Sequence, residues 1–156
     1  MSEETTAEHV TPYDFNNDPD GFVSDVREED LLLQQLLGVV PGKDGDNELG
    51  ITVTVNGAVI SGRAVSDARW QKLWTQALRE SNEQLGDAFN LVVPNSAKDN
   101  ADMVARREAE NRPIPAPFFL HLTDAEIVTG GFRRHVGLMR VRRVRIDAWA
   151  LGQLAD

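Results

Sequence analysis

The sequence contains no cysteine, which excludes disulfide bonds, thiolate catalysis and metal sites built on cysteine. Its histidines stand at positions 9, 121 and 135, and none belongs to a Glu-x-x-His or His-x-x-x-His pair. The chain therefore lacks the usual patterns of a zinc site. It also lacks the G-x-S-x-G motif of a nucleophilic serine and the Lys-Ser/Thr ending of a phosphate loop. We expect no catalytic residues, no metal and no cofactor, and so a protein that is not an enzyme.

Long apolar runs are absent as well. No stretch approaches the roughly 20 apolar residues of a membrane span. The first ten residues, MSEETTAEHV, are acidic and contain no basic stretch followed by an apolar one, which is the pattern of a secretory signal. We expect a soluble, cytoplasmic protein.

Positive charge is nearly missing from the first 30 residues, which hold ten acidic side chains and one basic one. The rest of the chain holds fifteen of each, so the net charge of −9 belongs to the N-terminal segment. Residues 1–24 are polar and interrupted by Pro12 and Pro19, and they cannot bury enough apolar surface to offset the entropy of ordering. We predict a disordered acidic tail over residues 1–24 and a single α+β domain over residues 25–156.

A β-hairpin is the clearest local pattern. In ITVTVNGAVISGRAVS, residues 51–66, apolar side chains occupy alternate positions on both sides of Asn56-Gly57. Alternation is typical of strands with one buried face, and Asn-Gly supplies the positive φ of a tight hairpin turn. Gly62 in the second strand predicts a bulge or a sharp bend.

The C-terminal third predicts more strands. FFLHL and the short run after Thr123-Asp124 have strand character, and Gly130-Gly131 separates them from an arginine-rich last segment. The alternation of that segment shifts near Arg142-Arg143, which predicts a bulge or a tight corner there.

Helical spacing occurs before and after the hairpin. SDVREEDLLLQQLLGVV predicts a helix capped by Ser24 or Asp25 and ended by Pro41-Gly42. A second helix begins at Ser66 or Asp67 and places Trp70 and Trp74 on one apolar face. Residues 86–117 are less regular and read as an insertion with a short helix near 98–110, followed by alternating prolines that impose an extended backbone.

These elements predict a small, strongly bent antiparallel β-sheet or an Sm-like partial barrel. An N-terminal helix precedes the sheet, and an inserted helix lies between the second and third strands. Because the edges of such a sheet remain open to a neighbouring strand, we expect a homo-oligomer.

Six arginines crowd into residues 133–145. On an open strand face their guanidinium groups suit phosphate, which raises the hypothesis of nucleic-acid binding. The neutral domain and the acidic tail argue against it, because the tail repels phosphate. The tail can instead contact the arginines, either masking them within one molecule or bridging two molecules. The residues that we predict to contact other proteins are Trp70, Trp74, Arg140, Arg142, Arg143, Arg145 and Trp149.

Four segments appear in an order that resembles the gas vesicle accessory protein U family: ELGITVTVNGAVISGRAVS, RWQKLWTQAL, PFFLHLTDAEIV and RRVRIDAWALGQL. The resemblance runs from about residue 48 to the end. It implies a non-enzymatic accessory protein that binds the vesicle shell or other gas vesicle proteins. Such a protein would assist the formation or clustering of gas vesicles, the protein-shelled flotation compartments of prokaryotic cells. The alternative is an Sm-like RNA-binding protein that uses the arginine-rich C-terminal strand.

Overall fold

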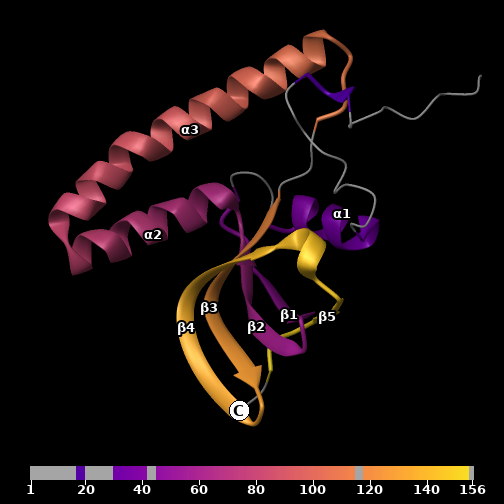
Figure 1. The fold of residues 1–156 in the computed structure, drawn as a ribbon, viewed down its shortest axis with the longest axis vertical. Helices are drawn as coiled ribbons and strands as arrows, with labels where there is room; N and C mark the ends of the chain where they lie inside the picture. Colours follow the sequence, from indigo (N-terminus) through magenta and orange to yellow (C-terminus); the bar gives the residue numbers. More distant parts are fainter. Residues whose placement is uncertain (1–16, 20–29, 42–44, 115–117, 155–156) are drawn as a thin grey trace, which may run out of the picture.

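The computed structural model describes residues 17–19, 30–41, 45–114 and 118–154, and these ranges confirm the α+β class (Figure 1). The elements in chain order are α1 (Leu31–Val39), β1 (Leu49–Val55), β2 (Ala58–Val65), α2 (Asp67–Ser81), α3 (Glu83–Ala109), β3 (Phe119–Thr129), β4 (Phe132–Arg142), the 3₁₀ turn η3 (Arg143–Arg145) and β5 (Ala148–Leu151). Among the described residues, none of the helices has the length and apolar character that a membrane crossing requires.

The five strands form one antiparallel sheet in the order β4-β3-β2-β1-β5. Figure 1 shows β3 and β4 curving together along one side of the molecule. Since β4 and β5 are the two edges, the sheet does not close. The antiparallel sheet of the sequence prediction is therefore confirmed, whereas the Sm-like barrel is not.

The predicted hairpin is present. Asn56 and Gly57 have φ angles of 50° and 80°, and Val55 pairs with Ala58 across the turn. The predicted irregularity at Gly62 is also present, because the β2–β3 register shifts there, between its neighbours Ser61 and Arg63. A Cβ atom at Gly62 would lie 3.0 Å from the carbonyl oxygen of Thr123, so the two strands approach closely where the sheet bends.

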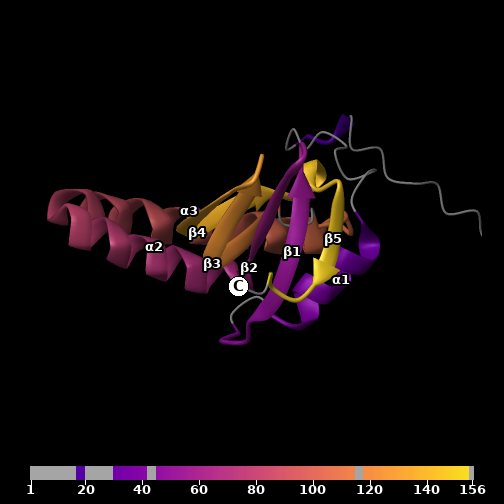
Figure 2. The same ribbon diagram turned by 90° about the horizontal axis from the view of Figure 1, so that it is seen from below.

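The hydrophobic core covers one face of this sheet. Alternate residues of β1 to β4 meet there, and Leu33 of α1 closes the cluster from outside the sheet. Figure 2 shows α1 running alongside β1 and β5. The buried members are Leu33, Ile51, Val53, Ile60, Ala64, Leu120, Leu122, Ala125 and Val141. Because strand side chains alternate, the neighbours of Leu120 and Leu122 must project from the opposite face.

Helix α1 begins later than the sequence predicted. Asp30 is its N-cap, and its carboxylate accepts hydrogen bonds from the backbone N–H groups of Leu32 and Leu33. The caps expected from the sequence, Ser24 and Asp25, lie outside the described residues. So do residues 1–16 of the predicted tail.

The predicted helix between the second and third strands is confirmed, but the prediction that residues 86–117 are irregular is wrong for residues 86–109. Helix α3 runs for 27 residues from Glu83 to Ala109 and contains Pro94. With α2 it forms a helical hairpin that projects from the sheet (Figure 1). Arg79 of α2 and Asp87 of α3 form an ion pair of 3.0 Å near the turn. Pro94 removes one backbone donor from the helix, and the helix continues on both sides of it.

Candidate functional site

A stack of side chains lies on the sheet face opposite the core, where α2 leaves the sheet. The Trp74 and Trp70 rings are 5.5 Å apart and nearly parallel, and the Trp70 ring lies 5.0 Å from His121. The His121 ring is 6.4 Å from Phe119, and the guanidinium of Arg140 lies 4.5 Å above the Phe119 ring. We call these five residues the aromatic ladder.

Local structure explains why α2 meets the sheet here. Ser66 follows β2 directly and caps α2, accepting a hydrogen bond of 3.3 Å from the backbone N–H of Arg69. Trp70 and Trp74 are four residues apart and therefore share one face of the helix.

The strands supply the other half of the ladder. His121 and Phe119 are two residues apart on β3, so both project from the outer face. The β3–β4 register places Arg140 opposite His121 and Arg142 opposite Phe119.

His121 is the titratable group inside the ladder. It is buried, and its Nε2 atom lies 3.3 Å from a carboxylate oxygen of Asp67. Burial lowers the pKa of His121, Asp67 opposes that shift, and the nearby charge of Arg140 adds to it. The neighbouring indole Nε1 of Trp70 is buried without a hydrogen-bond partner in the described part of the chain. The interior of the ladder is therefore uncharged at neutral pH, and its positive charge lies at the Arg140 end.

Other charges on the outer face are locally paired. Arg63 contacts Glu48 at 3.1 Å, and Arg133 contacts Glu126 at 2.9 Å. These pairs reduce the positive field that phosphate would meet. No observation on the described residues supports the RNA-binding alternative, and no three metal-ligating side chains come together among them.

The arginine-rich segment is divided between a strand and a turn, so the single arginine-rich strand of the RNA-binding alternative is not present. Strand β4 ends at Arg142, and η3 turns the chain over residues 143–145, which confirms the predicted corner. Arg143 is buried, and its backbone N–H donates to the carbonyl oxygen of Phe118 at 3.0 Å. Arg145 is exposed and is the last residue of η3. A 3₁₀ turn rotates successive side chains to different directions, so these arginines cannot share one strand face.

The structure divides the predicted contact residues into groups. Trp70, Trp74 and Arg140 meet in the aromatic ladder, with Arg142 beside it. Trp149 lies instead on β5, at the far edge of the sheet, and donates to Asp30 of α1. Their role as contact residues remains a prediction.

Sequence reasoning missed Phe119 and His121 as members of the ladder. The alternation within FFLHL was the available signal, because it puts both rings on one strand face. Which helix packs on that face depends on long-range pairing that a local pattern does not contain.

Residues 30–154 match the model of a family described as gas vesicle protein GvpU-like. No curated protein and no solved structure matches the chain. Of the described elements, the matched region includes the five strands, α1, α2 and α3, as well as the aromatic ladder, and it begins at the cap of α1.

Proposed function

Because the chain belongs to the GvpU-like family of gas vesicle proteins, we propose that it is a non-enzymatic accessory protein that assists the formation or clustering of gas vesicles. It would do so by binding the vesicle shell or other gas vesicle proteins. The family match over residues 30–154 is the observation that carries this proposal. We place its site of contact at the aromatic ladder.

The chemistry of the ladder supports a protein-binding role. Trp74 is half-buried and Arg140 is exposed, so each presents part of its side chain to a partner. Tryptophan and arginine are enriched at interfaces, because large flat groups bury much area and lose little rotamer freedom. Trp74 stands on a helix and Arg140 on a strand, so their positions are fixed. The buried Trp70 ring stacks on Trp74, and the buried His121 lies opposite Arg140 on the neighbouring strand.

A flotation experiment tests this proposal. Full-length protein is mixed with purified gas vesicles and centrifuged, and the protein recovered with the buoyant vesicles is measured. We expect wild-type protein to float with the vesicles. The double variant W74A/R140A should bind about tenfold or more weakly, since hot-spot side chains each contribute about 2 kcal/mol or more. The matched control K72A removes an exposed positive charge from the same helix and should bind like the wild type.

The outcomes separate two failures. If wild-type protein stays in solution, the vesicle-binding function itself is wrong. If the W74A/R140A variant floats as well as wild type, the ladder is not the contact surface.

Self-association remains a second part of the proposal. The long edge strand β4 carries exposed arginines and an irregular position at Gly137, where φ is 72°, and both features discourage edge pairing. Strand β5 is only four residues long. We therefore expect copies to associate through the helical hairpin rather than through the strand edges. A monomer in light scattering at tens of micromolar protein would contradict this expectation.

A further inference from the structure

The C-terminal end of α3 brings two arginines together. Asn111 has a positive φ of 51° just beyond the helix, its N–H bonds the carbonyl of Glu108 at 3.1 Å, and the N–H of Arg112 bonds the carbonyl of Arg107 at 2.8 Å. These two bonds define a Schellman motif, in which the side chains at the positions of Arg107 and Arg112 usually make an apolar contact. Here both positions carry a guanidinium group.

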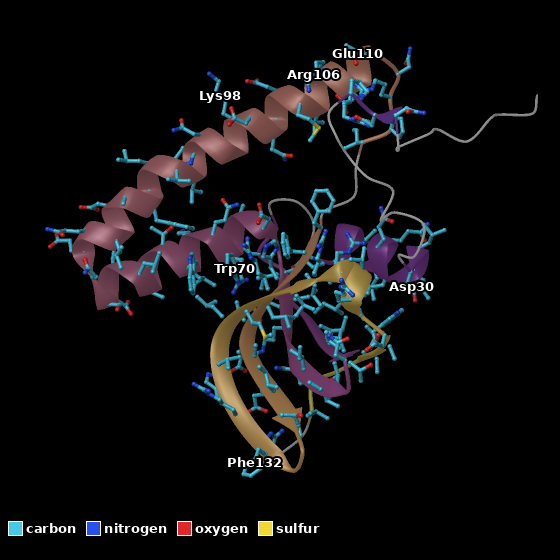
Figure 3. The ribbon with its side chains drawn as sticks, in the orientation of Figure 1. Asp30, Trp70, Lys98, Arg106, Glu110 and Phe132 are labelled. Atoms are coloured by element: carbon cyan, nitrogen blue, oxygen red, sulfur yellow. The ribbon has the colours of Figure 1, made fainter. Side chains whose placement is uncertain are left out.

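One carboxylate joins the two groups. Asp18 accepts hydrogen bonds from Arg107 Nη1 at 3.0 Å and Nη2 at 2.7 Å, and from Arg112 Nη2 at 2.7 Å. Asp18 and Arg107 have fully buried side chains, and Arg112 is 13% exposed. Figure 3 shows this end of α3 near the labels of Arg106 and Glu110, with the short indigo segment of residues 17–19 beside it.

Two other donors of these guanidinium groups bind residues at the end of α3. Arg107 Nε donates to the carbonyl of Pro113 at 2.7 Å, and Arg112 Nη1 donates to Glu110 at 2.8 Å. These bonds hold both guanidinium planes in place. The groups that face Asp18 then form a fork that matches the geometry of a carboxylate.

Two like charges held together and removed from water require an anion between them. Both arginines lie inside residues 30–154, the region that matches the family, whereas Asp18 lies outside it. The two arginines thus belong to the region that matches the family, and the carboxylate between them comes from a separate segment that carries most of the net negative charge.

We propose that Arg107 and Arg112 form a receptor for an acidic peptide segment, which Asp18 fills within one molecule and Asp18 of a second copy can fill between molecules. Every copy carries both the receptor and a ligand that fits it. The intramolecular ligand competes at an effective concentration on the order of millimolar, so exchange between copies requires a high local concentration. This site goes beyond the proposed function at the aromatic ladder, because no ladder residue takes part in it.

A peptide experiment tests the receptor. The probe is a labelled peptide of residues 11–25, and the target is the full chain with D18N, which empties the receptor while keeping the size of the side chain. We expect the peptide to bind in an anisotropy titration. The same peptide with D18N should bind about tenfold or more weakly, because it loses charge-assisted hydrogen bonds. The control peptide with D14N has the same net charge as the D18N peptide but keeps Asp18, so it should bind like the unsubstituted peptide.

Competition provides a second readout. The wild-type chain should bind the peptide about tenfold or more weakly than the D18N chain, since its own Asp18 occupies the receptor. Circular dichroism of the D18N chain checks that it is folded. Failure of the unsubstituted peptide to bind, or equal binding of the D14N and D18N peptides, would overturn the receptor.

Exchange between copies is tested by mixing two variants. The D18N chain has a receptor and no ligand, and an R107Q/R112Q chain has a ligand and no receptor. The single variant R112A can replace R107Q/R112Q, because it changes only one of the two arginines. Neither variant alone can form the contact between Asp18 and the two arginines of another copy. An equimolar mixture of the two should form this contact and give a larger complex in size-exclusion chromatography with light scattering. If the mixture elutes like the separate variants, exchange between copies is wrong. This test contains no gas vesicles, so its failure is distinct from failure of the proposed function.

Discussion

Trp149 of β5 donates its indole N–H to the carboxylate of Asp30 at 2.7 Å. The same carboxylate accepts the backbone N–H groups of Leu32 at 2.9 Å and Leu33 at 3.1 Å, and so caps α1. One acidic side chain therefore fixes the start of the helix and ties it to an edge strand. Leu33 and Trp149 also pack against the same core, so this link stabilises the contact between α1 and the sheet.

The first prediction concerns acid stability. The hydrogen bond from Trp149, followed by those from the backbone, lowers the pKa of Asp30. The unfolded pKa is about 3.9. Since the folded pKa is depressed, the stabilisation is fully present above pH 3.9 and is lost as the pH falls through the folded value. W149F should raise the pKa of Asp30 toward its ordinary range, as measured by NMR titration of the carboxyl group. An unchanged pKa in W149F would contradict the assigned cause.

The second prediction compares two glycines. In G62A the added Cβ would meet the Thr123 carbonyl oxygen at 3.0 Å and the Ala125 Cα at 3.3 Å, and backbone atoms at this distance cannot easily give way. We expect a loss of about 1–3 kcal/mol of unfolding free energy. At Gly38 of α1 a Cβ meets nothing within 4 Å, so G38A should stabilise the protein by about 0.5–1 kcal/mol. Urea unfolding measures both, and equal effects would contradict the packing argument.

The elements that the sequence predicts well are those whose causes are local. The first hairpin follows from the turn residues Asn56-Gly57 and from the alternation of apolar residues on both sides of them. The shift of the alternation at Arg142-Arg143 likewise predicts the corner there. Helix α3 is the opposite case. Pro94 breaks the helical pattern locally, yet α3 continues through it, and the ion pair of Arg79 and Asp87 joins α2 and α3 near the turn between them.

The candidate site divides in the same way. The spacing of Trp70 and Trp74 predicted a shared helix face, because residues four apart are separated by about one turn of a helix. Trp70 and His121 are in contact although they lie about fifty residues apart in the sequence. Asp18 and Arg107 are in contact across 89 residues. Such contacts depend on the folded topology, so they cannot be predicted from the local periodicity of either segment.

The third prediction concerns the pH dependence of the ladder. Burial lowers the pKa of His121, and Arg140 adds to that effect. Because the folded pKa is below the unfolded value of about 6.5, the unfolded state binds more protons in the interval between them. Stability should therefore be constant above about pH 7.5 and should fall as the pH drops through 6.5 toward the folded pKa.

Two variants check the causes at His121. R140M removes a nearby positive charge and should raise the pKa of His121, whereas D67N removes the opposing carboxylate and should lower it further. NMR titration of the imidazole measures both shifts. Shifts of the same sign in the two variants would show that the charges of Arg140 and Asp67 do not act on His121 as argued.

The last prediction uses two N-terminal truncations that differ in whether they keep Asp18. A chain that begins at residue 17 retains the carboxylate between Arg107 and Arg112, and a chain that begins at residue 24 lacks it. Loss of one member of a buried ion pair leaves the other charge uncompensated, at a cost of about 3–5 kcal/mol. We expect the shorter chain to lose this amount in the local opening of the C-terminal turns of α3, measured by amide hydrogen exchange, while the longer chain exchanges like the wild type. If both truncations open α3 equally, the net charge of the N-terminal segment rather than Asp18 stabilises it.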